Sequence, residues 1–277
     1  MPSLTNSAQT TCIHDLAAAC LHATEVADKL AATYQARDLL GQGALVWDSA
    51  NPPAPIAHTR FPARPQQVEP RDLPKRSLAS VEGRIALLHA VAHIEFTAIH
   101  LAWDILYRFR ELPDAFRADW LGVAVEEAEH FDMILSRLRE LGADYGDLPV
   151  HRGLWSLAVD TADDVLARLA LVPRCMEARG LDVTPGMIDG LKRHGDLASV
   201  ALLERILHDE VGHVVLGSRW FAYVCRERGL DAETAYFDLL GRYLRSPPRG
   251  PFNVELRKTA GFSSSELERL ERGRAAA

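Results

Sequence analysis

Two short stretches decide the fold of this chain, Val125-Glu126-Glu127-Ala128-Glu129-His130 and Leu207-His208-Asp209-Glu210-Val211-Gly212-His213. Each contains Glu-x-x-His, at Glu127/His130 and at Glu210/His213. Residues three apart on a helix lie about one turn apart on the same face, so the carboxylate and the imidazole of each pair can bind one ion. Two such pairs, each preceded by a lone Glu on another helix, form the ligand set of di-iron and di-manganese carboxylate bundles.

A lone Glu precedes each pair at a similar distance. Glu95 lies 32 residues before Glu127, and Glu177 lies 33 residues before Glu210. This interval accommodates the rest of one helix, a turn and the return along an antiparallel neighbour. Chance supplies roughly one Glu-x-x-His in a chain of this composition, so the matching spacing of two complete sets is the informative signal. The sequence therefore predicts two helical hairpins, each with Glu followed by Glu-x-x-His.

Hydrophobic periodicity predicts helices for most of the chain. One of them begins at Ser77 or Ser80 and ends at about Phe109. The others cover residues 8–40, 113–142, 161–180, 185–194, 196–228, 231–245 and 263–273. Within the third bundle helix, 161–180, Pro173 should produce a kink one turn before Glu177. The residues leave open whether the ligand from this helix is Glu177 or one of Asp163 and Asp164.

Composition narrows the class of protein. With 277 residues, 48% hydrophobic, 25% charged and a net charge of −7, the chain resembles an ordinary globular protein rather than a general nucleic-acid binder. No apolar run approaches the roughly 18 residues of a membrane span, and no secretory signal begins the sequence. Four scattered cysteines indicate neither a zinc site nor a disulfide framework. We therefore expect a cytoplasmic protein without a membrane partner.

The stretches that contain the predicted ligands resemble those of the ferritin-like superfamily. More closely, the chain resembles the bacterial family known as domain of unknown function 455. The resemblance covers most of the chain, through Leu88–Glu95, Glu126–Phe131, Leu171–Gly180, His208–His213, the Pro-rich segment and Gly250–Asn253. It implies an all-α, ferritin-like four-helix bundle with a dinuclear metal site, whose pattern is similar to that of di-iron tRNA hydroxylases. Glu95 and Glu177 are then the bridging carboxylates, and Glu127/His130 and Glu210/His213 are the terminal pairs.

The predicted organisation has four parts. They are an N-terminal helical segment at 1–49, a Pro-rich connector at 50–76, the four-helix core at 77–229 and a C-terminal helical extension at 230–277. The connector contains seven prolines and five Lys or Arg residues. We interpret it as an ordered segment that wraps the bundle, with a basic edge for an anionic substrate such as RNA as the alternative.

Four carboxylates and two imidazoles favour two metal ions, iron or alternatively manganese, including a mixed pair. We therefore expect an oxygen-dependent oxidoreductase or hydroxylase of a small or nucleotide-linked substrate, as a monomer or homodimer. One alternative is an iron-binding ferroxidase without an organic substrate, and another is a helical interaction module with a vestigial site. The sequence identifies neither the substrate nor the electron donor, and it does not support a nucleic-acid partner.

Overall fold

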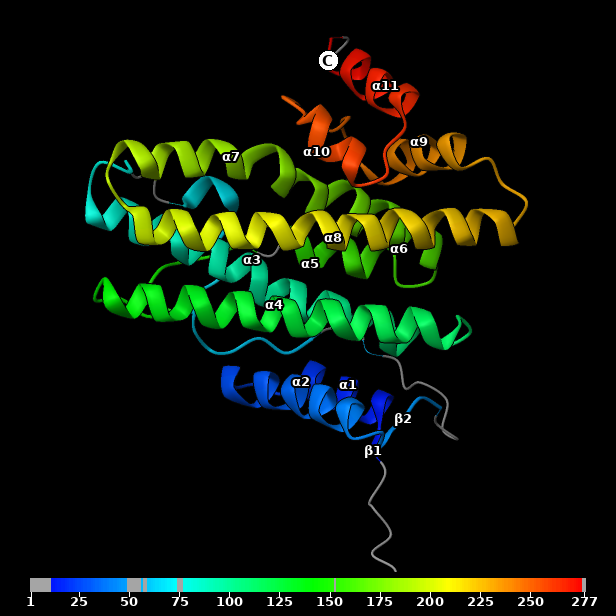
Figure 1. Cartoon of the computed structure of the whole chain (residues 1–277), viewed down its shortest axis with the longest axis horizontal. Coiled ribbons are helices and arrows are strands. Elements are labelled where there is room, and N and C mark those ends of the chain that lie inside the picture. The colour runs from blue at the N-terminus through cyan, green and yellow to red at the C-terminus, as the bar shows by residue number, and fades with distance from the viewer. Residues whose placement is uncertain (1–10, 49–55, 57–58, 74–76, 152, 276–277) are drawn as a thin grey trace, which may run out of the picture. The chain divides into compact units, whose positions relative to one another are not determined.

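The computed structural model describes residues 11–48, 56, 59–73, 77–151 and 153–275, and it is mostly helical with almost no strand (Figure 1). The all-α expectation is therefore confirmed. The chain divides into two compact units, one made of residues 1–64 and 95–129 and the other of residues 65–94 and 130–277. The long helices α3 (Val81–Arg108) and α4 (Asp114–Glu140) each contribute to both units.

The first unit begins with a short parallel pair of strands, β1 (Thr11–Cys12) and β2 (Leu45–Val46). Between them, α1 (Ile13–His22) and α2 (Val26–Gly41) lie side by side (Figure 1). Trp103 of α3 joins them to the core, because its indole N–H donates to Thr33 Oγ1 at 2.9 Å. The single helix predicted over 8–40 is thus two helices, and residues 8–10 lie outside the described part.

The break between α1 and α2 has a local cause. The last carbonyl groups of α1 accept hydrogen bonds from outside the helix. Lys29 Nζ donates to the Cys20 carbonyl at 2.8 Å, and Thr59 Oγ1 and the Arg60 amide donate to the Leu21 carbonyl at 2.9 and 3.0 Å. Such bonds replace the intrahelical partners that a helix C-terminus lacks. Hydrophobic periodicity alone does not reveal them.

The second unit contains the remaining elements besides its parts of α3 and α4. They are η1 (Pro70–Asp72), α5 (Gly153–Asp160), α6 (Val165–Leu171), the π-helical η2 (Val172–Glu177), α7 (Ala178–Arg193), α8 (Leu197–Glu227), α9 (Ala232–Tyr243), α10 (Val254–Thr259) and α11 (Ser264–Ala275). Helices α5 and α10 were not predicted from the sequence. Asp196 caps α8 by accepting from the Ser199 amide, and Ser80 Oγ accepts from the Gly83 amide at the start of α3.

The helix predicted over 161–180 is divided differently. It begins at Val165, passes through the π-helical turn at Pro173 and continues past Gly180 to Arg193. Pro185 therefore lies inside α7 and does not begin a separate helix. The disturbance expected from Pro173 is real and takes the form of the π turn, because Pro has no N–H to donate to the preceding turn.

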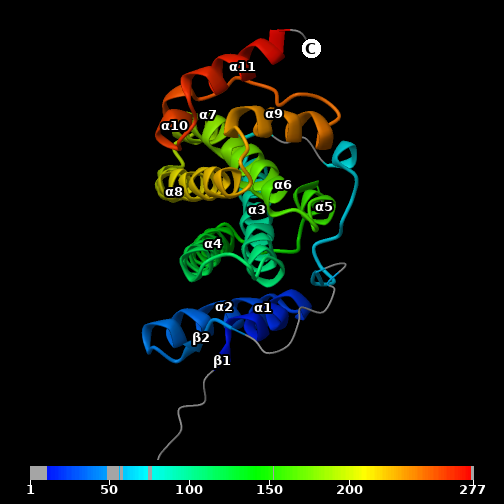
Figure 2. The ribbon, with the colours of Figure 1, turned by 90° about the vertical axis from the view of Figure 1, so that its right-hand side faces the viewer.

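Helices α7 and α8 form an antiparallel hairpin around Gly195 and lie side by side in Figures 1 and 2. Their register is set where Pro173 packs against Gly217. A Cβ atom added to Gly217 would lie 2.4 Å from Pro173 Cβ, so only glycine fits at this position. The two glycines of α8 therefore differ: Gly217 permits the close approach of a neighbour, whereas no atom lies within 4 Å of a Cβ added to Gly212.

Helix α3 is long enough and apolar enough to span a membrane. This differs from the expectation that no apolar segment approaches the length of a membrane span. However, 72% of the relevant window is buried inside the protein. This burial is what a core helix shows.

Candidate metal centre

Four of the six predicted ligands lie together. Glu95 of α3, Glu127 and His130 of α4 and Glu210 of α8 each offer one ligand atom, and these atoms are all within 4.8 Å of one another. Glu95, Glu127 and His130 have only 4%, 1% and 1% of their surface exposed. Burying carboxylates at this depth is costly unless they are paired or bind a metal, so the cluster can hold a metal ion.

The local sequence explains why these side chains point inward. Glu127 lies among buried residues of the same helix face, Ala124, Ala128 and Phe131, whereas Glu126 and Glu129 are exposed. These buried residues form the inner face of α4. One of the outward carboxylates, Glu129, lies 3.8 Å from Arg37 Nη1 in a solvent-exposed pair.

Asp209 fixes the orientation of the His130 ring. His130 Nε2 lies 3.1 Å from Asp209 Oδ2, which also accepts from Arg205 Nε at 2.6 Å. Burial acts to raise the pKa of Asp209, but the bonds from Arg205 and His130 outweigh it and hold this pKa below its usual range. Because the ionised carboxylate only accepts, the ring proton lies on Nε2 and Nδ1 keeps the lone pair that a metal requires.

The second Glu-x-x-His pair contributes one member to the cluster. His213 is buried beside it: its Nδ1 lies 3.4 Å from Glu210 Oε1, and its ring centroid lies 5.9 Å from that of His130. His213 is therefore adjacent to two cluster residues, although it is not one of the four whose ligand atoms converge.

Glu177 is the last residue of the π-helical turn, and it too is absent from the four converging residues. The hairpin register nevertheless indicates where it lies. Pro173 and Gly217 are each 22 residues from Gly195, and Glu177 and His213 are each 18 residues from it. The two helical segments run antiparallel. Glu177 is four residues closer to Gly195 than Pro173, and His213 is four residues closer to Gly195 than Gly217. Glu177 and His213 therefore lie about one helical turn from the Pro173–Gly217 contact, in the same direction. The alternatives Asp163 and Asp164 precede α6, and Asp164 caps that helix and pairs with Arg228.

Two other histidines of α3, His89 and His93, have structural partners. His89 Nε2 accepts from the Gly146 amide at 3.0 Å, while His93 contacts Tyr145 Oη at 2.8 Å and the His151 carbonyl at 3.1 Å. A carbonyl can only accept, so His93 carries its proton on Nε2 and Tyr145 donates to Nδ1. Burial lowers the pKa of His93 to about 4, which keeps it neutral. These bonds fasten the loop after α4.

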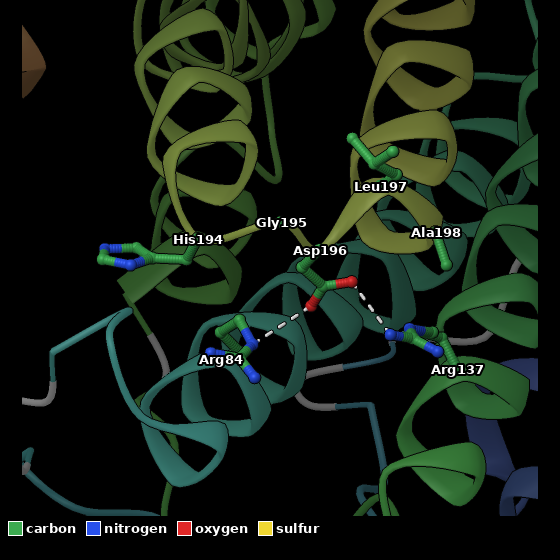
Figure 3. Close-up of a pocket in the computed structure, with 7 residues that line it drawn as sticks. All are labelled: Arg84, Arg137, His194, Gly195, Asp196, Leu197 and Ala198. Carbon is green, nitrogen blue, oxygen red and sulfur yellow. Dashed lines mark hydrogen bonds and ion pairs between the residues drawn. The ribbon is translucent and has the colours of Figure 1, made fainter.

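A surface pocket of about 320 Å³ lies where α7 turns into α8, and its lining includes Arg84, Arg137 and Asp196 but none of the six predicted ligands (Figure 3). Asp196 Oδ2 lies 3.3 Å from Arg84 Nε, and Asp196 Oδ1 accepts from Arg137 Nη2 at 2.9 Å. We call these three residues the Asp196 hub. It connects α3, α4 and α8 and caps the last of them, so this pocket marks a structural junction.

The donor set is one that can bind a divalent metal ion. Three carboxylates and one imidazole are hard and borderline ligands, which divalent ions of similar hardness prefer over thiolates. The described free cysteines take no part in it. Sequence reasoning did not assign a role to Asp209. Its position next to Glu210 was visible, but the equivalent residue of the first motif, Glu126, is exposed, so spacing alone does not distinguish the two.

Comparisons with known proteins agree with the resemblance to the family known as domain of unknown function 455. The family model described as a protein of unknown function (DUF455) matches residues 22–268. An uncharacterised protein of Haemophilus influenzae is 46% identical over 215 residues, which are 75% of this chain and 75% of that protein. No solved structure gives a significant match to the chain.

Proposed function

We propose a function for this chain, which belongs to the DUF455 family of proteins of unknown function: it is a dinuclear metal protein that catalyses an oxygen-dependent oxidation, with hydroxylation of a small or nucleotide-linked substrate as the preferred reaction. The observation that supports it best is the buried cluster of Glu95, Glu127, His130 and Glu210. Three buried or half-buried carboxylates around one imidazole form a negatively charged group that one or two metal cations would balance.

The two remaining predicted ligands complete this proposal. Glu177 and His213 occupy corresponding positions of the α7–α8 hairpin, and His213 already lies beside Glu210 and His130. Together the six residues offer four carboxylates and two imidazoles. Four negative charges balance two divalent cations, which favours two metals over one, with iron preferred and manganese as the alternative.

The proposed fold of the core is a ferritin-like four-helix bundle made of α3, α4, η2 with α7, and α8. Its support is the placement of the ligands: one Glu on each of two helices and Glu-x-x-His on each of the other two, which is the pattern of such bundles. The Asp196 hub and the His130–Asp209 bond supply contacts among α3, α4 and α8 that this arrangement requires.

The six residues would hold a pair of ferrous ions, which would supply oxygen activation for a hydroxylation in which one oxygen atom enters a C–H bond and the other leaves as water, with two electrons and two protons from a donor. The chain itself holds the ligands in place. Asp209 keeps the His130 ring in one tautomer and orientation. Apolar side chains next to the ligands, among them Phe96, Ala128, Phe131 and Val214, are almost fully buried and keep bulk water away.

Oxygen uptake tests the proposal. The protein is loaded anaerobically with ferrous iron, mixed with air and ascorbate, and compared with Glu127→Ala and with free iron at the same concentration. We expect uptake by the wild-type protein above that of free iron, increased further by a suitable nucleoside or small organic substrate, and lost in Glu127→Ala. Uptake equal to that of free iron under all these conditions would contradict an oxygen-dependent function.

The same experiment separates the ferroxidase alternative. A ferroxidase consumes oxygen in proportion to added iron, needs no organic substrate and accumulates ferric mineral. If uptake stops once the bound iron is oxidised when ascorbate and substrate are left out, continues when both are present, and no mineral forms, the hydroxylase proposal stands. Continued mineral formation in a large assembly would replace it with iron handling.

A further inference from the structure

The π-helical turn η2 is fastened to the C-terminal helices through one of its own residues, Arg174. The Arg174 side chain is only 3% exposed, and its guanidinium pairs with Glu266 of α11 at 2.8 Å. Arg174 lies directly after Pro173, which packs on Gly217, and three residues before Glu177. The contacts of the Arg174 side chain therefore affect the conformation of the turn that ends at Glu177.

Aromatic rings surround the Arg174 guanidinium. Its central carbon lies 4.9 Å from the ring centroid of Phe221, 4.4 Å from that of Tyr236 and 4.7 Å from that of Phe262. A guanidinium at these distances is attracted to the negative faces of the rings, and the planar group stacks where an ammonium would not. The rings come from α8, from α9 and from the segment before α11, so the cage joins three parts of the second unit.

Glu266 connects this cage to the start of α11. One carboxylate oxygen pairs with Arg174, and the other accepts from the Ser263 amide at 2.8 Å. Ser263 Oγ in turn accepts from the Glu266 amide at 3.0 Å, which completes a capping box. The carboxylate that starts α11 thus also neutralises the buried cation of the π turn.

A further bond holds the backbone of the turn. The Tyr236 hydroxyl donates to the Arg174 carbonyl at 3.0 Å. A π-helical segment replaces the regular hydrogen-bond ladder with a poorer one, and Pro173 removes a donor from it. External bonds to both the side chain and the carbonyl of Arg174 compensate for these losses.

We propose that Arg174 is a positioning residue for the second metal position: the C-terminal helices, acting through Glu266, Tyr236 and the aromatic cage, hold the π turn in the conformation that directs Glu177 toward His213. The inference rests on the proposed function, because it requires Glu177 to be a ligand. It also gives α9 and α11, which contact Arg174 through Tyr236 and Glu266, a role in the proposed metal centre; Figure 2 shows both helices.

Metal binding in variants of the ion pair tests this. Glu266→Gln keeps an oxygen for the Ser263 amide but removes the charge opposite Arg174, and Arg174→Lys keeps the charge but loses the stacking plane. The control is Asp182→Asn, because Asp182 and Arg257 form an equally buried pair at 2.8 Å that joins α10 to α7 beyond the π turn. Each protein is titrated anaerobically with ferrous iron, and bound iron is counted by equilibrium dialysis and mass spectrometry.

We expect two iron ions per wild-type and Asp182→Asn chain. In Glu266→Gln and Arg174→Lys, the dissociation constant of the weaker iron should rise roughly 10-fold or more, as is typical for residues that orient ligands, while the tighter iron is retained. Adding Glu177→Ala to Glu266→Gln should cause little further loss.

Other outcomes identify which claim fails. Two irons bound with wild-type affinity by folded Glu266→Gln and Arg174→Lys would overturn the positioning role and leave the proposed function intact. An equal loss in Asp182→Asn would also overturn it, because general loosening of the extension would then explain the effect. No iron in the wild-type protein would overturn both claims.

Discussion

The His130 imidazole illustrates how a single residue of the centre is controlled. Its Nε2 bond to Asp209 at 3.1 Å sets the tautomer, and Arg205 keeps Asp209 ionised. The Glu-x-x-His spacing was sufficient to predict that Glu127 and His130 point the same way. It was not sufficient to predict Asp209, since a partner on another helix follows from packing and not from periodicity.

Replacing Asp209 with Ala should weaken metal binding at His130. The ring would lose the acceptor that fixes its proton, and we expect a fall in metal affinity of about 10- to 100-fold without unfolding. Calorimetric titration with ferrous iron under nitrogen measures this. Arg205→Ala is the matched control, because the Arg205 side chain is 61% exposed and reaches the metal only through Asp209. A smaller effect for Asp209→Ala than for Arg205→Ala would refute the assignment.

Lys29 gives a prediction about pH. It is fully buried, and burial lowers its pKa from 10.5 to about 8. Between these two pKa values the unfolded chain binds more protons than the folded one, so the free energy of unfolding should rise with pH. Below this pH range the burial of the charged Lys29 lowers the free energy of unfolding by its full amount. In Lys29→Met this contribution is absent. The unfolding free energy of the variant minus that of the wild type should therefore be larger at pH 7 than at pH 10, by up to about 3 kcal/mol.

Urea denaturation of the two proteins at several pH values between 7 and 10 measures that difference. The cysteines and tyrosines titrate in both proteins, so their contributions largely cancel. A difference in unfolding free energy that does not change with pH would show that Lys29 keeps its ordinary pKa.

Among the elements, long helices were the easiest to predict. The predicted ends of α4, α8 and α9 agree with the structure within a few residues, because their apolar stripes are long and Pro113, Asp196 and Gly229 mark their ends. The helices α5 and α10 are short, so their hydrophobic periodicity is weak. They form because of their packing against other elements, which the sequence does not reveal. The π turn required knowledge of what Pro173 packs against, which the sequence does not contain.

The contact between Pro173 and Gly217 can be tested at the level of the hairpin. Gly217→Ala should destabilise the protein by about 1–3 kcal/mol, because the new methyl group would overlap the proline ring. Gly212→Ala is the control on the same helix. No atom lies within 4 Å of a Cβ added there, so it should stabilise the helix by roughly 0.5–1 kcal/mol.

Thermal denaturation compares these variants. Pro173→Ala should recover part of the stability that Gly217→Ala loses, since it removes the group with which the methyl clashes. If Gly217→Ala is as stable as Gly212→Ala, the register of the α7–α8 hairpin is not set by this contact.

At the scale of the molecule, the second unit is held together by buried charge as well as by apolar packing. The Asp196 hub joins α3, α4 and α8 at one end, while Arg174–Glu266 and Arg257–Asp182 attach the C-terminal helices. None of these pairs was predictable, because each joins residues far apart in the sequence. The division into four segments at 49, 76 and 229 stays a prediction, as do the partners and the oligomeric state.

The Asp196 hub predicts a large effect from a single substitution. Asp196→Ala removes a helix cap and leaves two partly buried arginines without their shared carboxylate, so we expect a loss of about 3 kcal/mol. Asp231→Ala removes only an exposed cap of α9 and should cost about 1 kcal/mol. Chemical denaturation of both variants measures this, and equal losses would contradict the hub.

The metal content of the protein tests the central claim most directly. The wild-type protein and a Glu127→Ala, Glu210→Ala double variant are purified without chelator, loaded anaerobically with ferrous iron, and analysed by mass spectrometry. The account predicts about two iron or manganese ions per wild-type chain, and none in the double variant although it remains helical by circular dichroism. Absence of metal from the wild-type chain after loading would contradict the account, because the two Glu-x-x-His pairs would then be structural.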